Sequence, residues 1–295
     1  MLFLVEKDIF VLDRGFRDCV QNLRQKSFEV FTPAFSYGRQ TLTTAQANHS
    51  RLVTKVRYVV EVVNGHLKTK YSFLSNCLRN NLLDQAHRIY RIVASINNKF
   101  VPRTYSDQGR EAEVIQTFLD NLIRDNLLKA IVEELGLRRR SHFSPLESFD
   151  QIPCLSLGQL RRIAGGSYQV TESVNYYFDT LHRFGRLSHF CCSLSIVFSR
   201  FNIHTQDPIL IKTKISSRYS RAGFYLVFVL IHKASESHQC IREYYCQFLV
   251  GSRTLGCCCH VMAVILHLTW ARDTDRIRGP AEWLNNFAIE CESAD

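Results

Sequence analysis

The chain has 295 residues, 46% of them hydrophobic, and carries a formal net charge of +10. This length exceeds that of most single cores, so more than one domain is expected. The apolar runs are too short to span a bilayer and the N-terminus lacks a signal-peptide core, which excludes secreted and membrane-spanning classes. We therefore expect the 11 cysteines to be thiols or metal ligands inside the cell.

The first hundred residues combine strand-like and helix-like patterns. The apolar run 9–12 predicts a buried central strand, and Asp13 follows it where a helix begins. Ligands of open α/β sheets bind at this end of the strands. A second strand is predicted over 28–31, and amphipathic helices over 82–97 and 111–135. The pattern indicates an α/β unit followed by helices.

The segment 50–65 has the apolar period of a helix, and Gly65 is placed to end it. Its polar stripe sets Glu61 among basic side chains. This stripe is either a solvated face joined by an Arg57–Glu61 ion pair or, together with Asp13, a carboxylate site for divalent metal and phosphate. The apolar stripe of this helix comprises Leu52, Val56, Val59, Val60 and Val63. The cations predicted to contact phosphate are Arg14, Arg17, Arg51, Lys55, Arg57 and Lys68.

Glycine, proline and a basic run 138–140 mark a linker before a second region. Beyond it, strands are predicted over 209–215, 223–232 and 244–250, because these stretches are rich in β-branched and aromatic residues. The second region is therefore expected to be a smaller α+β domain. The excess of basic residues makes DNA or another polyanion the favoured partner.

Cysteine and histidine gather at the end of the last predicted strand and the start of the helix that follows. Cys246 lies in the strand, and Cys258 and His260 lie at the helix start. Thiolate and imidazole are the ligands that Zn²⁺ prefers, so a hairpin of this kind can form a zinc site. Alternatively, these cysteines are small buried hydrophobic residues.

Three segments resemble the Harbinger-type DDE transposase nuclease. They are Asp-Arg-Gly-Phe at 13–16, Ala-Asn-His-Ser-Arg-Leu-Val-Thr-Lys at 47–55 and Val-Val-Glu-Val-Val-Asn-Gly at 59–65. The resemblance implies an RNase H-like fold, nuclear location, and three carboxylates that hold Mg²⁺ or Mn²⁺ for phosphodiester chemistry. By motif, Asp13 resembles the second carboxylate and Glu61 the third.

The family's first aspartate lies on an earlier strand, whereas only twelve residues precede Asp13 in this sequence. Asp8 does not replace it, because an odd spacing along one strand directs the two side chains to opposite faces. We therefore expect an incomplete triad that binds Mg²⁺ weakly and does not cleave DNA strands. An unpaired edge on the strand before Asp13 also predicts self-association, or association with a longer related transposase.

The cysteine hairpin resembles the SWIM zinc finger, whose pattern is Cys-x-Cys followed by a loop and Cys-x-His. Cys246, Cys258 and His260 match this pattern, and Phe248 occupies the place of the second cysteine. The resemblance implies a weakened zinc site, with Cys257 or Cys259 as the alternative fourth ligand.

The expected organisation is a partial RNase H-like domain over 1–104 and a helical segment and linker over 105–154. An α+β domain over 155–275, with its zinc-finger hairpin at about 240–272, and a tail over 276–295 complete it. Three functions agree with this organisation. The preferred one is a transposase-derived metal-binding protein that binds DNA without cutting it. The alternatives are an active DDE endonuclease whose first aspartate lies upstream, and a zinc-dependent interaction module.

Overall fold

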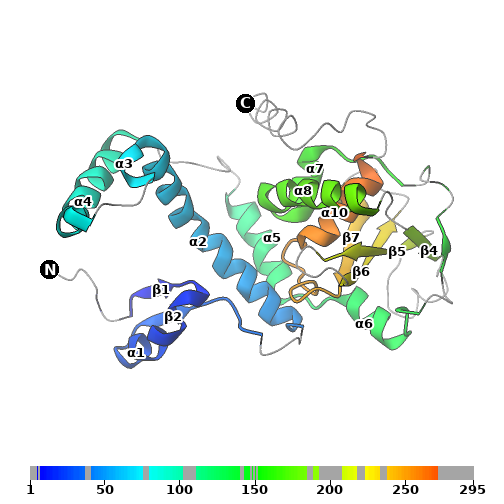
Figure 1. Ribbon diagram of the computed structural model, residues 1–295. Coiled ribbons are helices and arrows are strands. Elements are labelled where there is room, and N and C mark those ends of the chain that lie inside the picture. The colour runs from blue at the N-terminus through cyan, green and yellow to red at the C-terminus, as the bar shows by residue number, and fades with distance from the viewer. Residues whose placement is uncertain are drawn as a thin grey trace. The chain divides into compact units, whose positions relative to one another are not determined.

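The chain forms two compact units, Met1–Phe35 with His49–Asp120 (unit 1) and Ser36–Asn48 with Asn121–Asp295 (unit 2) (Figure 1). The domain boundaries at residues 104 and 154 remain predictions. A computed structural model describes residues 5, 7–36, 41–75, 80–101, 111–139, 143–146, 148, 150, 152–184, 189–192, 208–217, 223–232 and 238–271. The basic residue Arg140 and the tail 276–295 lie outside these residues.

Unit 1 begins with a small β-α-β arrangement and continues as helices. Its strands β1 and β2 are parallel neighbours, with Phe10 opposite Val30. The connecting turns form a short 3-10 helix and a helix that follows it directly. The elements are β1 (Ile9–Val11), η1 (Arg14–Cys19), α1 (Val20–Gln25), β2 (Glu29–Phe31), α2 (Thr44–Lys70), α3 (Ser72–Ser75), η2 (Asn80–Leu82), α4 (Leu83–Phe100) and α5 (Glu111–Ile123). The start of α2, up to Asn48, and the end of α5, from Asn121, belong to unit 2.

The prediction of a buried central strand before Asp13 is wrong in two respects. Within the described residues β1 pairs only with β2, and its first residue, Ile9, is 61% exposed. Only Val30 of β2 is buried. The apolar run does form a strand with Asp13 just beyond its end, but the strand lies at the edge of a two-stranded sheet.

Helix α2 is longer than predicted and presents its apolar stripe differently. Gly65 does not end the helix, which continues to Lys70, because a glycine inside a helix costs only about 1 kcal/mol relative to alanine. Val56, Val59 and Val60 are more than half exposed, so the stripe covers no core. In this helix Val53 and Leu67 are buried instead.

Unit 2 is built on a five-stranded antiparallel sheet in the order β3-β4-β5-β6-β7. The three strands predicted from sequence are present, although β7 ends at Cys246 and not at Val250. The elements are α6 (Leu127–Glu134), β3 (Ser144–Pro145), α7 (Leu157–Ala164), α8 (Ser167–Phe184), β4 (His189–Cys192), β5 (Pro208–Ser216), β6 (Phe224–His232), η4 (His238–Cys240), β7 (Ile241–Cys246) and α10 (Cys259–Thr269).

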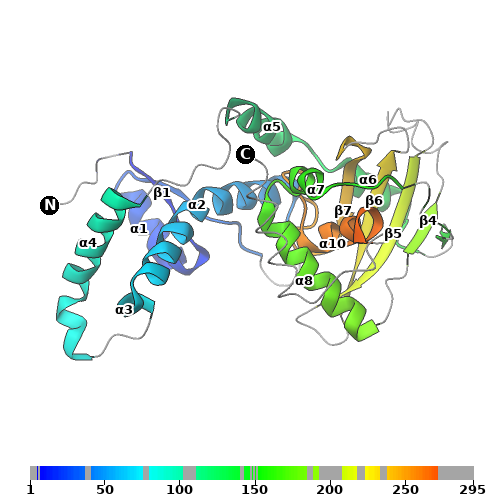
Figure 2. The same cartoon turned by 90° about the horizontal axis from the view of Figure 1, so that it is seen from above.

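Helices cover both faces of this sheet (Figure 2). Alternate side chains of β5 and β6, such as Ile211 and Val229, pack with α7, α8 and α10 in the larger core. The intervening ones, such as Leu210 and Phe228, pack against α6 in a smaller core. A strand covered on both faces reads as a continuous apolar run, which explains the sequence of β6.

The helix predicted over 111–135 is interrupted and forms α5 and α6. Asn126 caps α6, since its side chain accepts a hydrogen bond from Lys129 N at 2.8 Å. At the other end of α6, the buried ammonium of Lys212 donates to the carbonyls of Leu137, Arg138 and Arg139 at 3.2, 2.6 and 3.0 Å. A cation placed there satisfies carbonyls that follow the helix.

None of the helices in the described part of the chain combines the length and apolar character needed to cross a membrane.

The burial of His267 in α10 should make the stability of unit 2 depend on pH. Its Nδ1 lies 3.1 Å from the hydroxyl of Tyr177 on α8, and burial lowers the pKa of His267 to about 4. The unfolded chain protonates this histidine near pH 6.5. The contribution of neutral His267 to the free energy of unfolding is therefore fully present above about pH 6.5. It falls by up to roughly 3 kcal/mol as the pH drops toward 4.

His267→Gln should flatten this acid-side loss, measured as the free energy of unfolding of the intact chain between pH 7 and pH 4. His87→Gln, a change at an exposed position of α4, is the matched control and should leave the slope unchanged. An unaltered slope in His267→Gln would show that this histidine does not carry the effect.

Candidate metal centre

A tight turn at residues 246–251, which we call the knuckle, follows the last strand and contains a thiol that accepts a backbone hydrogen bond. Cys246 ends β7, and its Sγ accepts a hydrogen bond from Phe248 N at 3.3 Å. Gly251 closes the knuckle, with its N donating to Phe248 O at 2.8 Å and its O accepting from Cys246 N at 3.1 Å. A Cβ at Gly251 would collide with the Cys246 carbonyl, so only glycine fits.

Three side chains converge on one point at this knuckle. Cys246, Cys258 and His260 offer ligand atoms that all lie within 4.8 Å of one another, and all three residues are buried. His260 Nδ1 lies 3.9 Å from Cys246 Sγ and 4.0 Å from Cys258 Sγ. In the described part of the chain this is the one group of three or more His, Cys, Asp or Glu residues with such geometry. Cys257 and Cys259, the alternative fourth ligands, lie outside it.

The two thiols differ in acidity. Burial raises the pKa of Cys246, and its hydrogen bond to Cys258 raises it further. Burial also opposes ionisation of Cys258, but hydrogen bonds from Cys246 and His260 and the charges of His260 and Arg253 hold the pKa of this thiol well below its usual value. Cys258 is therefore the more acidic thiol of the pair.

Aromatic rings surround the imidazole of His260. Its ring centroid lies 4.7 Å from Tyr176, 4.8 Å from Tyr225 and 4.7 Å from Phe248. Phe248 and Tyr225 also contact each other, at 5.3 Å. The hydroxyl of Tyr176 is engaged elsewhere, since it donates to Ser216 O. The surroundings of the imidazole are therefore largely aromatic.

Asn48, from the first turn of α2, holds the loop that leads to Cys258. Its Oδ1 accepts hydrogen bonds from Thr254 N at 2.8 Å and Leu255 N at 3.0 Å. Its Nδ2 donates to Asn121 O, Leu122 O and the Thr254 hydroxyl at 3.1, 3.0 and 2.7 Å. Asn48 is fully buried, so these bonds are sheltered from water.

Asn126 holds the same loop from a second direction. Its Nδ2 donates to Tyr244 O at 2.8 Å and to Ser252 O at 3.0 Å, which joins β7 to the loop. Together, Asn48 and Asn126 form what we call the asparagine clamp. The clamp fixes residues 252–255, and this positions Cys258 and His260 opposite Cys246.

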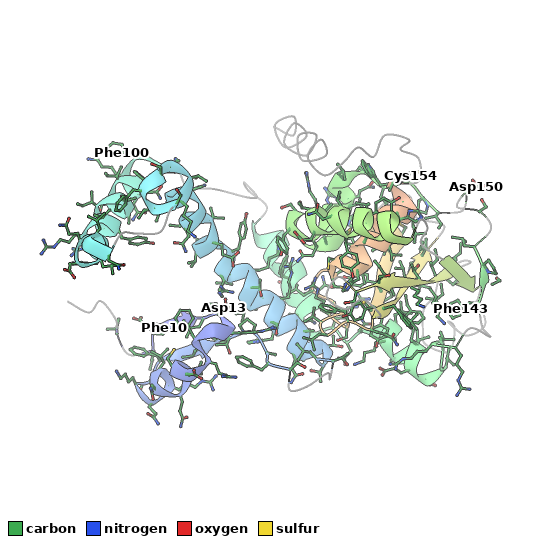
Figure 3. The ribbon with its side chains drawn as sticks, in the orientation of Figure 1. Phe10, Asp13, Phe100, Phe143, Asp150 and Cys154 are labelled. Atoms are coloured by element: carbon green, nitrogen blue, oxygen red, sulfur yellow. The ribbon has the colours of Figure 1, made fainter. Side chains whose placement is uncertain are left out.

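The two carboxylates predicted to bind Mg²⁺ lie in unit 1 and share one arginine. Asp13, labelled in Figure 3, caps η1 by accepting a hydrogen bond from Arg14 N at 2.7 Å. Arg57 Nη2 lies 3.3 Å from Asp13 Oδ2 and 3.7 Å from Glu61 Oε1. The structure thus brings Asp13 and Glu61 together, but with a guanidinium between them. Within the described residues no third ligand joins them.

The six cations predicted to contact phosphate differ in accessibility. Arg14, Arg17 and Lys68 are exposed, while Lys55 and Arg57 are half-buried. Lys55 lies 5.1 Å above the ring of Phe118. Arg51 is buried, with 7% of its surface exposed. The exposed three are the most accessible to a phosphate, and Arg17 already pairs with Asp18 at 3.3 Å.

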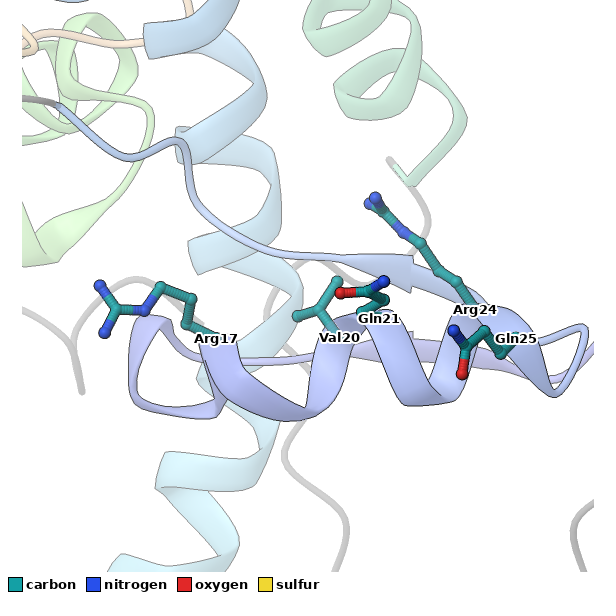
Figure 4. Close-up of a pocket in the computed structure, with 5 residues that line it drawn as sticks. All are labelled: Arg17, Val20, Gln21, Arg24 and Gln25. Atoms are coloured by element: carbon teal, nitrogen blue, oxygen red, sulfur yellow. The ribbon is translucent and has the colours of Figure 1, made fainter.

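An open hollow of about 600 Å³ lies along η1 and α1 (Figure 4). Two arginines, Arg17 and Arg24, and two glutamines line it together with Val20. Arg24 donates to Val30 O at 3.3 Å. The lining is basic and polar, which suits an anionic surface better than an apolar ligand.

Sequence reasoning identified the three converging ligands but missed the residues that position them. The asparagine clamp and the rings around His260 come from positions far from the hairpin in sequence, so no local pattern reveals them. The one available signal was Asn126, which lies before an apolar periodic segment in the manner of a helix cap.

Loss of the clamp should destabilise unit 2 and loosen the metal-ligand group. Asn48→Ala leaves the buried amides of Thr254 and Leu255 without acceptors, and we expect a loss of about 2–5 kcal/mol in the free energy of unfolding. The amides of Thr254 and Leu255 should exchange with solvent faster, as measured by hydrogen exchange. Asn98→Ala, at an exposed position of α4, is the control. Equal exchange in both variants would mean that Asn48 does not hold the loop.

Residues 2–98 match the family model described as DDE superfamily endonuclease. Comparison with curated proteins and with solved structures gave no match. The match covers the segments that contain Asp13 and Glu61 but ends before unit 2's sheet and its metal-ligand group. The N-terminal part of this chain therefore carries a DDE superfamily endonuclease domain.

Proposed function

We propose that this protein is a transposase-derived DNA-binding protein of the nucleus that holds a metal ion at Cys246, Cys258 and His260 and does not cut DNA. The observation that carries DNA binding is the match of residues 2–98 to the DDE endonuclease family, whose substrates are nucleic acids. The composition, with 37 basic and 27 acidic residues, agrees with DNA binding. The convergence of two thiols and an imidazole supports metal binding.

The absence of cleavage follows from the carboxylate geometry. Two-metal phosphodiester chemistry needs ligands that clamp both the attacking and the leaving oxygen. Asp13 and Glu61 are half-exposed and share the guanidinium of Arg57, which would have to leave before Mg²⁺ could bind between them. Within the described residues the carboxylates of Asp13 and Glu61 therefore do not fit a two-metal centre.

A second function, a metal-dependent interaction module, is favoured by one observation. Unit 2 contains both hydrophobic cores of the sheet and the complete metal-ligand group. A partner that binds unit 2 only when metal is present would support this function. Self-association through the exposed valines of α2 is compatible with either function.

DNA binding should depend on the exposed cations of unit 1. We expect Arg14→Gln, Arg17→Gln and Lys68→Gln combined to weaken binding of a short mixed-sequence duplex. Each phosphate contact contributes about 0.9 to the slope of log affinity against log salt concentration, so the triple variant should lose up to roughly 3 from that slope. Fluorescence anisotropy over a salt series measures both quantities.

The matched control removes three exposed charges of α4, by Arg88→Gln, Arg91→Gln and Lys99→Gln. If both triple variants lose affinity equally, binding follows net charge and not the predicted surface. Plasmid incubated with the wild-type chain and Mg²⁺ or Mn²⁺ should stay supercoiled. Nicking that disappears in Asp13→Ala and Glu61→Ala would instead identify a working nuclease.

A further inference from the structure

The metal-ligand group of unit 2 has three donors and closed surroundings. Trigonal ligation by bonds of about 2.3 Å to sulfur and 2.0 Å to nitrogen requires sulfur–nitrogen distances of roughly 3.7 Å, and tetrahedral ligation roughly 3.5 Å. The distances from His260 Nδ1 to the two sulfur atoms, 3.9 and 4.0 Å, are closer to the trigonal value. An ion can therefore bind all three atoms with little movement of the chain.

An apolar ring, that of Phe248, packs against the imidazole of the metal-ligand group. Phe248 contributes its backbone N–H to Cys246 Sγ and its ring to the contact with His260. Tyr225 and Tyr176 close two further sides of the imidazole. A zinc ion with three protein ligands completes its tetrahedron with water, and a shell of packed rings disfavours that water.

Charge in the surroundings favours a monovalent ion. Arg253 is buried, and its guanidinium donates to Cys257 O. Among the ion pairs of the described residues none includes Arg253, and its charge acts on Cys258. Two thiolates with a monovalent cation leave one negative charge, which balances Arg253. Two thiolates with a divalent cation are neutral and leave the buried guanidinium uncompensated.

We propose that Cys246, Cys258 and His260 form a three-coordinate site for a soft monovalent cation, Cu(I), and that Phe248 makes the same site poor for Zn²⁺. Thiolate ligands suit Cu(I), and this ion does not require a fourth ligand. Phe248 is half-buried and lies within the knuckle between Cys246 and Gly251, so part of its ring separates the imidazole from solvent. This inference rests on the proposed metal-binding function and specifies its ion.

The test compares affinities for Cu(I) and Zn²⁺ in the full-length chain under reducing conditions, with a chromophoric chelator competing for each metal. Phe248→Cys supplies the missing donor and should raise Zn²⁺ affinity at least about tenfold, with a smaller change for Cu(I). Phe248→Leu keeps the apolar cover and should retain the wild-type ratio of the two affinities. X-ray absorption at the copper edge should show two sulfur neighbours and one nitrogen in the wild type.

The outcomes separate this inference from the function on which it rests. If the wild type binds Zn²⁺ as tightly as Phe248→Cys does, the inference is overturned, although the metal site stands. If Cys246→Ser and His260→Gln bind both ions as the wild type does, the site itself is refuted. Cys154→Ser, at an exposed thiol outside the group, controls for copper bound at the surface and should not alter the stoichiometry. A four-coordinate copper spectrum would also overturn the inference.

Discussion

The hydrogen bonds of the asparagine clamp are the interaction on which unit 2 depends most. The loop between the knuckle and α10 carries few apolar side chains, and its backbone amides are buried. Asn48 and Asn126 supply partners for these groups from outside the hairpin. Without them, burial of the loop would cost the desolvation of several backbone groups. The meeting of Cys246 with Cys258 and His260 is a consequence of this polar network.

Two glycines make the same geometry possible. Gly251 has no room for a Cβ beside the carbonyl of Cys246, and Gly256 has a positive φ of 65° and lies against the carbonyl of Ala164. The second contact joins the loop to the end of α7 and so to the larger core. A side chain at either position would move the backbone that carries Cys258. Hydrogen bonding and steric fit thus act on the same few residues.

The sequence predicted β5 and β6 well because each is rich in β-branched and aromatic residues and is buried on both faces. It missed β3 and β4, and β7 begins at Ile241, before the predicted start at residue 244. It also singled out Cys246, Cys258 and His260, whose side chains converge, because thiolate and imidazole in a hairpin suit a metal ion. It failed on α2, where an apolar stripe predicts a buried face but Val56, Val59 and Val60 are exposed. Amphipathic period shows that a helix forms, and only tertiary contacts decide what covers it. The role of Asn48 was likewise invisible, because its partners lie some two hundred positions away.

Asn48 also changes how the likeness to DDE nucleases is interpreted. It lies inside a segment that carries the resemblance, and its side chain forms hydrogen bonds with Thr254 in the loop that leads to Cys258. A residue of this segment therefore has a structural role in unit 2. The clamp and the cores bring the three side chains within 4.8 Å of one another. An ion bound there would stabilise unit 2 in proportion to its occupancy.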